Sequence, residues 1–254
     1  HCELLFMILK ILIQKPKTIE QVVSILNPDD THFSKPRSTI NRWIELGLFT
    51  SDNGLIDLTK FAKSQLNVLN NRDLKQNLPY LIRRILFNKE NYKVENLWTT
   101  TGANDFYTAF TWFMMQNPFI FHLKTWKSIV TIMGEQKKKN IDREIIQNDT
   151  RLPGLLAYGH YLGFISGNRK HNFIDPTRAI LDDIDLLIKK NEEISFEEFL
   201  RRLNDAIPIF DNGNIRVEFE KSLDERYLDN IGIKTISPAL SLSLIRLEEM
   251  NFLR

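Results

Sequence analysis

The first fourteen residues place apolar side chains at helical spacing. Leucine or isoleucine occupies positions 4, 5, 8, 11 and 12, which predicts a helix with a wide apolar face that ends near Pro16. Thr18 then stands where a helix cap is needed, ahead of a short second helix over residues 19–26. The chain therefore opens with two helices joined by a short break.

A third helix and a hairpin follow. Ser34 can cap a helix that runs to about Leu46, and Pro36 is tolerated in its early turns because the first N–H groups of a helix have no partner. Gly47 supplies the left-handed residue that ends this helix, and strands over 48–50 and 55–58 flank the polar turn 51–54. Three helices and a hairpin predict a winged-helix domain over residues 1–66.

The middle region, residues 67–145, is rich in helical patterns and aromatic side chains. Large apolar residues are densest between Phe106 and Phe121. They could form an aromatic platform for a ligand, but side chains of this kind at helical spacing more often form the core. We therefore expect the following residues to be buried: Phe106, Tyr107, Phe110, Trp112, Phe113, Met114, Met115, Phe119 and Phe121.

The end of the third helix and its hairpin recur later in the chain. Leu-Gly-Leu-Phe at 46–49, followed by Ile-Asp-Leu-Thr at 56–59, has a counterpart in Leu-Gly-Phe-Ile at 162–165 followed by Ile-Asp-Pro-Thr at 174–177. In both copies Asp-x-Thr can cap the next helix. The second copy is two residues longer, with a basic turn over 166–172. This repeat predicts a second winged helix within the C-terminal region, residues 146–254.

A third module of the same kind is expected at the C-terminus. Ser195 and Glu198 lie in capping-box register at the start of one helix, and a helix over 237–250 leads into Phe252 and Leu253. Between these helices, residues 215–219 alternate as a strand does. The fold class expected is therefore mainly α with short β-hairpin wings: tandem winged helix-turn-helix modules joined by a helical middle region.

Charge is distributed unevenly along the chain. The net charge is +2, but residues 1–170 hold 23 Lys and Arg against 15 Asp and Glu, and residues 171–254 hold 11 against 17. The two parts thus carry +8 and −6. A basic binding face and an acidic interaction region would produce this asymmetry, although charge runs are also typical of solvated surfaces.

The third helix carries the side chains best suited to DNA. Arginine can read guanine edges and asparagine can read adenine edges in the major groove. Winged helices also serve protein contacts, so a DNA-binding face and a protein-binding face both remain open. The residues predicted to contact double-stranded DNA are Lys35, Arg37, Ser38, Asn41 and Arg42 of this helix, with Asn168, Arg169 and Lys170 of the second hairpin. The run at 137–139 could add phosphate contacts or simply end a helix.

Familiar enzyme motifs are absent. No phosphate loop, dinucleotide fingerprint, nucleophile elbow or zincin helix is present, so we expect no catalytic residues and no cofactor. The five histidines are scattered, and no metal site is expected. Asp182, Asp183 and Asp185 could chelate a cation, but their helical surroundings favour a solvated helix face. No segment predicts a membrane span or a secretory leader, and a lone cysteine, Cys2, suits a reducing cytosol.

The C-terminal hundred residues carry a resemblance to a known family. The Leu162-Gly163-Phe164 sequence leading through a basic hairpin to residues 175–180, and the closing pattern over 237–248, resemble the DpdG family. That family belongs to the Dpd gene cluster associated with 7-deazaguanine modification of DNA and restriction of foreign DNA. The resemblance implies a non-catalytic component of a bacterial defence system that acts on DNA with sister proteins. The alternative is an interaction scaffold or transcriptional regulator whose winged helices, with the acidic stretch 182–229, contact proteins.

Overall fold

The computed structural model describes residues 2–27, 34–69, 73–92, 94–99, 103–123, 125–168, 171–228 and 236–253. The chain forms two compact units, His1–Asn91 and Tyr92–Arg254. Both are mainly helical, and each holds one small antiparallel sheet, of three and two strands respectively. Mainly α structure with short hairpins is therefore confirmed, whereas the domain boundaries expected near residues 66 and 145 stay predictions.

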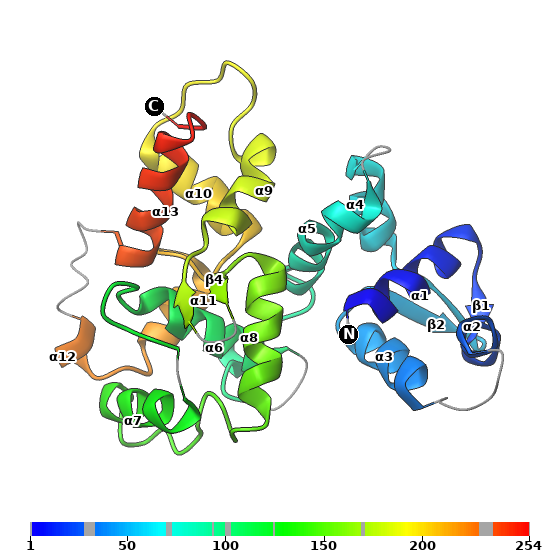
Figure 1. Ribbon diagram of the computed structural model, residues 1–254, viewed down its shortest axis with the longest axis horizontal. Coiled ribbons are helices and arrows are strands. Elements are labelled where there is room, and N and C mark those ends of the chain that lie inside the picture. Colours follow the sequence, from blue (N-terminus) through cyan, green and yellow to red (C-terminus); the bar gives the residue numbers. More distant parts are fainter. Residues whose placement is uncertain are drawn as a thin grey trace. The chain divides into compact units, whose positions relative to one another are not determined.

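Unit 1 opens with three helices and a hairpin (Figure 1). The hairpin's second strand lies in the middle of the sheet, in the order β1-β3-β2, with both pairings antiparallel. The three helices and the hairpin predicted from the sequence are confirmed. The elements in chain order are α1 (Cys2–Gln14), β1 (Lys17–Thr18), α2 (Ile19–Leu26), α3 (Ser34–Glu45), β2 (Phe49–Asp52) and β3 (Leu55–Leu58).

The apolar face of α1 forms the centre of this unit. Leu5, Ile8, Leu9 and Leu12 are buried, and α1 packs against α2, α3 and β3. Thr18 caps α2 in a capping box, because its hydroxyl accepts from the Gln21 backbone while the Gln21 side chain accepts from Thr18. Two further helices, α4 (Lys60–Leu69) and α5 (Leu74–Leu86), pack on each other and complete the unit.

Unit 2 is built around α6 (Asn104–Met115), a helix buried on nearly every side. It packs on α11 (Asn214–Glu220) and α13 (Pro238–Glu249). The core expected around Phe106 to Phe121 is confirmed for most of its members. The remaining elements are η1 (Val94–Asn96), α7 (Trp126–Gln136), α8 (Arg151–Leu162), β4 (Ile165–Asn168), β5 (His171–Ile174), α9 (Thr177–Leu187), α10 (Phe196–Ala206) and α12 (Glu225–Leu228).

Two of the residues expected in the core are not buried, since Phe106 is half-buried and Phe119 is exposed. Phe119 is 70% exposed, and its neighbour Ile120 is 76% exposed. Helix α6 ends at Met115, so the helical spacing that predicted burial no longer applies four residues later. The expectation for Phe119 was wrong because it extended one periodic pattern across a helix end.

The third helix-to-strand module is not formed. Residues 215–219 lie in α11 rather than in a strand, and residues 250–252 form turns and a bend with no strand before 253. Ile215 and Phe219 are four residues apart, a spacing that fits one face of a helix as well as alternate positions of a strand. Both are buried, and Arg216, directly after Ile215, is buried as well, which a helix allows and the alternation of a strand on a single buried face does not.

Two local predictions in the acidic part have mixed outcomes. Ser195 does cap α10, accepting from the Glu198 backbone. Asp182, Asp183 and Asp185 lie on α9 as expected, but Asp183 is fully buried, so they are not three members of one solvated face. Helical periodicity explains this outcome, because Asp183 follows the buried Ile180 by three positions.

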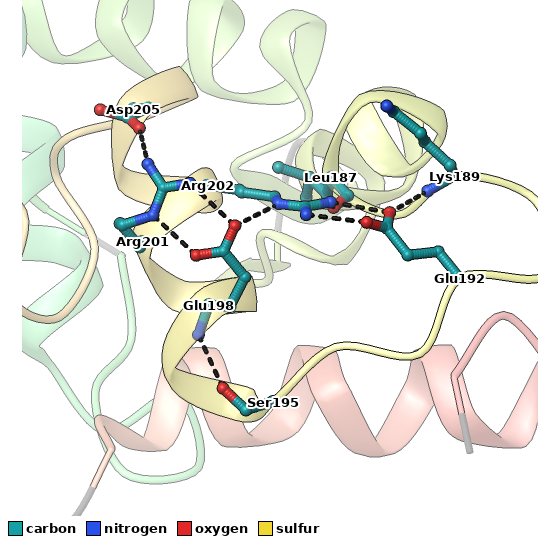
Figure 2. A network of polar contacts seen from close by, with 8 residues as sticks. All are labelled: Leu187, Lys189, Glu192, Ser195, Glu198, Arg201, Arg202 and Asp205. Carbon is teal, nitrogen blue, oxygen red and sulfur yellow. Dashed lines mark hydrogen bonds and ion pairs between the residues drawn. The ribbon is translucent and has the colours of Figure 1, made fainter.

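An ion-pair network connects α9 to α10 (Figure 2). Arg202 donates to the Leu187 carbonyl at the end of α9, to both carboxylate oxygens of Glu192 in the connecting loop, and to Glu198. Arg201 adds bonds to Glu198 and Asp205. The two arginines therefore hold the acidic side chains around them rather than extending freely into solvent.

Candidate nucleic-acid interface

Helix α3 presents a polar face to solvent. Ile40 and Trp43 are buried against the core of unit 1, which fixes the rotation of the helix. Its other side exposes all five side chains predicted to contact DNA: Lys35, Arg37, Ser38, Asn41 and Arg42. The structure thus brings this part of the candidate site together on one helix.

Two carboxylates contact the cations of this face. Arg37 pairs with Glu20 of α2 at 2.9 Å, and Arg42 pairs with Glu45 at 3.0 Å. The pKa of Glu20 is lowered by a hydrogen bond from the Glu20 backbone N–H and by the charge of Arg37. All four side chains are more than half exposed, and ion pairs that are this open to water contribute little to stability. A phosphate group can therefore compete for either arginine.

Neither carboxylate was predicted from the sequence as part of this face. Glu45 lies three residues after Arg42 on the same helix, a spacing at which side chains meet, so this pair could have been predicted. Glu20 is separated from Arg37 by 17 positions and meets it only because α2 packs on α3.

The hairpin next to α3 lacks the basic side chains that would attract a polyanion. Its tip, Asp52-Asn53-Gly54, is exposed and carries an acid but no cation. Asn53 and Gly54 have φ of 49° and 79°, as a two-residue turn with two left-handed positions requires. This hairpin is a tight turn without a basic side chain at its end.

The helix-and-hairpin repeat is present with a constant offset. Strand pairing aligns Phe49 with Leu58 and, in the second copy, Ile165 with Ile174. Each pair of equivalent positions is 116 residues apart (165 − 49 and 174 − 58). The two copies therefore have the same length, and the two-residue difference inferred from the sequence was wrong.

Backbone hydrogen bonds confirm this register. Leu48 donates to the Trp43 carbonyl, and 116 residues later Phe164 donates to that of Gly159, both at 2.9 Å. Thr59 then donates to Leu48, and Asp175 to Phe164, both at 3.1 Å. Asp175 is thus the counterpart of Thr59.

The side chains of both counterparts bond to the start of the next helix, although only Thr59 is a helix cap. The Thr59 hydroxyl accepts from the Ala62 backbone, and the Asp175 carboxylate accepts from the Thr177 backbone and hydroxyl. The cap expected from Asp-x-Thr is thus made by Thr59 in the first copy, whereas in the second Pro176 is the N-cap and Asp175 binds Thr177 from one position earlier. The helix ends are alike as well, with φ of 79° at Gly47 and 81° at Gly163.

The predicted basic turn over 166–172 is mostly strand. Residues up to Asn168 belong to β4 and residues from His171 to β5, which leaves two connecting positions. Asn168 is exposed, and its side chain accepts from the His171 backbone. The candidates Arg169 and Lys170 lie outside the described residues. These three candidates belong to unit 2, whereas the candidate residues of α3 belong to unit 1.

Helix α8 does not reproduce the polar face of α3. At the offset of 116, the positions of Arg37, Ser38, Asn41 and Arg42 hold Pro153, Gly154, Ala157 and Tyr158. The position of Lys35 holds Arg151, which pairs with Asp105. The two copies therefore share a backbone frame but not a surface chemistry.

Other candidate groups are engaged elsewhere or do not assemble. Lys137 is mostly buried and pairs with Glu144, and Lys138 donates to the Lys221 carbonyl. Within the described ranges, His, Cys, Asp and Glu form no group of three that could hold a metal ion. No helix in the same ranges is both long and apolar enough to span a bilayer.

Comparison with known proteins places the whole chain in one family. A search of the curated proteins and a search of the solved structures each found no match. The model of the DpdG-like family matches residues 2–254, which is nearly the full length and not only the C-terminal hundred residues that carry the resemblance. The chain therefore belongs to the DpdG-like family.

Proposed function

We propose that the chain is a non-catalytic, DNA-binding component of the Dpd DNA modification and restriction system. Membership in the DpdG-like family supports a role in that system. Its partners would be double-stranded DNA and the other proteins of the system, in the cytoplasm of the cell that the system defends.

We infer that residues 1–66 form a winged-helix module. The support is the element order α1-β1-α2-α3-β2-β3 and the sheet order β1-β3-β2, in which the hairpin follows the third helix directly. In such modules the third helix enters the major groove and the hairpin lies beside it. Helix α8 with β4 and β5 repeats the helix-and-hairpin part of the arrangement.

The exposed polar face of α3 carries the proposal. Arg37 and Arg42 can each exchange a weak surface carboxylate for a phosphate, to which guanidinium binds in a bidentate manner. Asn41 lies between them, exposed, with an amide that suits an adenine edge. The hairpin of unit 2 would add phosphate contacts through Asn168, Arg169 and Lys170.

A fluorescence-anisotropy titration with duplex DNA at several salt concentrations tests this function. The double variant Arg37→Glu/Arg42→Glu should weaken binding at least about tenfold and reduce the salt slope by about 2, because each arginine would no longer neutralise a phosphate. Absence of binding by the wild-type chain at low salt would refute the proposal.

The control needs the same change of charge without structural damage. Arg201 and Arg202 are unsuitable, because reversing them breaks the network between α9 and α10. Lys60 and Lys75 are exposed in the first turns of α4 and α5, where an acidic side chain suits the helix dipole, and Lys60→Glu/Lys75→Glu also changes the charge by four. Equal losses in the two double variants would show that α3 has no special part in binding.

A protein-interaction scaffold is the second candidate. The outward positions of α8 favour it, because Pro153, Gly154 and Ala157 are exposed where α3 has polar and cationic side chains. A groove-reading role for α8 would require cations or amides at those positions. If the scaffold is the correct function, both charge-reversal variants leave duplex binding unchanged and weak.

A further inference from the structure

The turn after α6 exposes two large apolar side chains. Phe119 and Ile120, at 70% and 76%, are the most exposed large hydrophobic residues in the described part of the chain. They are adjacent in sequence, and the residues on either side, Pro118 and Phe121, are buried. The two side chains therefore project from a turn whose flanks are fixed in unit 2.

Hydrogen bonds fix the backbone of this turn. The Asn117 side chain accepts from the Phe119 N–H at 2.9 Å, and the Asn117 carbonyl accepts from Ile120 and Phe121 at 3.2 and 2.8 Å. Phe121 packs edge-on against Trp112 of α6, with ring centroids 5.2 Å apart. The backbone of the exposed pair is thus held in place before any partner binds, which removes the backbone part of the cost of ordering it.

The base of the turn is also braced. Trp112 donates from its indole to the Gln136 side chain at 2.7 Å, and the amides of Gln116 and Gln136 bond each other in both directions at 3.2 Å. Gln116 lies just after α6 and Gln136 ends α7, so the turn rises from a junction of two helices. The backbone that carries the exposed pair is therefore anchored to both helices.

The size of the apolar pair limits what can cover it. An aromatic side chain covers about 150–250 Å² when fully buried, so these two side chains offer about 250–300 Å². A standard protein interface takes about 800 Å² from each partner, of which about 57% is apolar, and this is more than the two side chains of the turn supply. The gap between two base pairs of a kinked duplex, by contrast, accepts one or two apolar side chains.

The charge around the turn favours a polyanion. Between Phe119 and Asn140 the sequence has five lysines and a single acid, Glu135. Although Lys137 pairs with Glu144 and Lys138 bonds the Lys221 carbonyl, Lys139 is exposed. Of the described side chains near the turn, His122 and Lys127 are exposed. Apolar wedges that kink DNA are flanked by cations of this kind, which bind the phosphates beside the opened step.

We propose that Phe119 and Ile120 form an apolar wedge that inserts at a base step of bound duplex DNA and partly unstacks it. The wedge rests on the proposed function, because it needs DNA to be held by the chain. It adds an activity that α3 does not supply, which is deformation of the duplex.

Duplexes that carry a single 2-aminopurine at successive positions test the wedge, since this base emits more strongly when it is unstacked. With the wild-type chain, emission should rise at one position or a few. In Phe119→Ser/Ile120→Ser the rise should disappear and Kd should increase about tenfold, the loss expected when stacking on a base is removed. Phe119→Leu/Ile120→Val, which keeps apolar side chains, should retain the emission.

The control removes apolar surface elsewhere in unit 2. Ile245 and Phe252 are about half exposed, and Ile245→Ser/Phe252→Ser should bind and unstack DNA as the wild type does. Unchanged emission and affinity in Phe119→Ser/Ile120→Ser would overturn the wedge. Wild-type binding without any rise in emission would overturn the wedge alone, whereas absence of wild-type binding would overturn the proposed function as well.

Discussion

Substitution of two glycines in unit 2 tests how the helix-and-hairpin frame is held. Gly163 ends α8 with φ of 81°, and a Cβ there would lie 2.8 Å from the Ala179 backbone nitrogen of α9. The left-handed conformation costs a residue with a side chain about 1 kcal/mol, and the clash with backbone that cannot move aside adds about 2 kcal/mol. Gly163→Ala should therefore lower the free energy of unfolding by about 3 kcal/mol.

Gly154 gives the opposite expectation. It is exposed within α8, and a Cβ there meets nothing within 4 Å. Alanine is favoured over glycine inside a helix by about 1 kcal/mol, so Gly154→Ala should stabilise unit 2 by that amount. The two variants of one helix should differ by about 4 kcal/mol in total.

Urea unfolding followed by tryptophan fluorescence measures the difference. The chain has four tryptophans, and only Trp43 lies in unit 1, so a common Trp43→Phe background restricts the signal to unit 2. Gly54→Ala, followed by circular dichroism without that background, isolates the backbone strain, because φ is 79° and the space around it is open. It should cost about 1 kcal/mol. Equal losses for Gly54→Ala and Gly163→Ala would refute the argument from the contact with α9.

Three further predictions follow from the ion pairs. Glu20→Gln releases Arg37 from its carboxylate, so under the proposed function duplex affinity measured by anisotropy should rise about threefold; weaker binding would contradict it. The bond from Arg202 lowers the pKa of Glu192 to about 2, so this carboxylate stabilises the fold above about pH 4.5 and loses that effect as the pH falls toward 2. Urea midpoints at pH 5 and pH 2.5 should therefore differ less in Arg202→Ala than in the wild type, and equal differences would count against the network. Asp175→Ala removes a buried carboxylate that accepts from the first residue of α9 and pairs with Arg246 of α13, and should cost about 2 kcal/mol in urea unfolding; a loss below about 0.5 kcal/mol would show that solvent replaces both contacts.

Local signals in the sequence were sufficient for the first three helices and the hairpin of unit 1, but not for β1, which exists only through its pairing with β3. Thr18 caps α2 and Gly47 ends α3, and each effect depends only on residues within one turn of the chain. The exposed face of α3 could be predicted for the same reason, because Trp43 fixes which side is buried. The ion pair between Glu20 and Arg37 could not be predicted, since it depends on how two helices pack.

The errors arose where one pattern fits two structures. Ile215 and Phe219 satisfy both helical and strand periods, and only the packing of α11 on α6 selects the helix. In the repeat, the Asp-x-Thr strings at 57–59 and 175–177 suggested equivalence, but the strand pairing aligns Asp175 with Thr59. Aligning the two copies by their identical residues therefore placed the second strand two residues away from the register that the hydrogen bonds define.

The shared frame of the two copies has a consequence for engineering. The hydrogen bonds that the two copies share join main-chain atoms, such as those from Leu48 to Trp43 and from Phe164 to Gly159. They do not depend on which side chains α3 and α8 present to solvent. The outward residues of α3 can therefore be grafted onto α8, each at the position 116 residues later in the sequence. A chain with two such helices would be bivalent, and its gain in avidity would show whether both helices can bind one duplex at the same time.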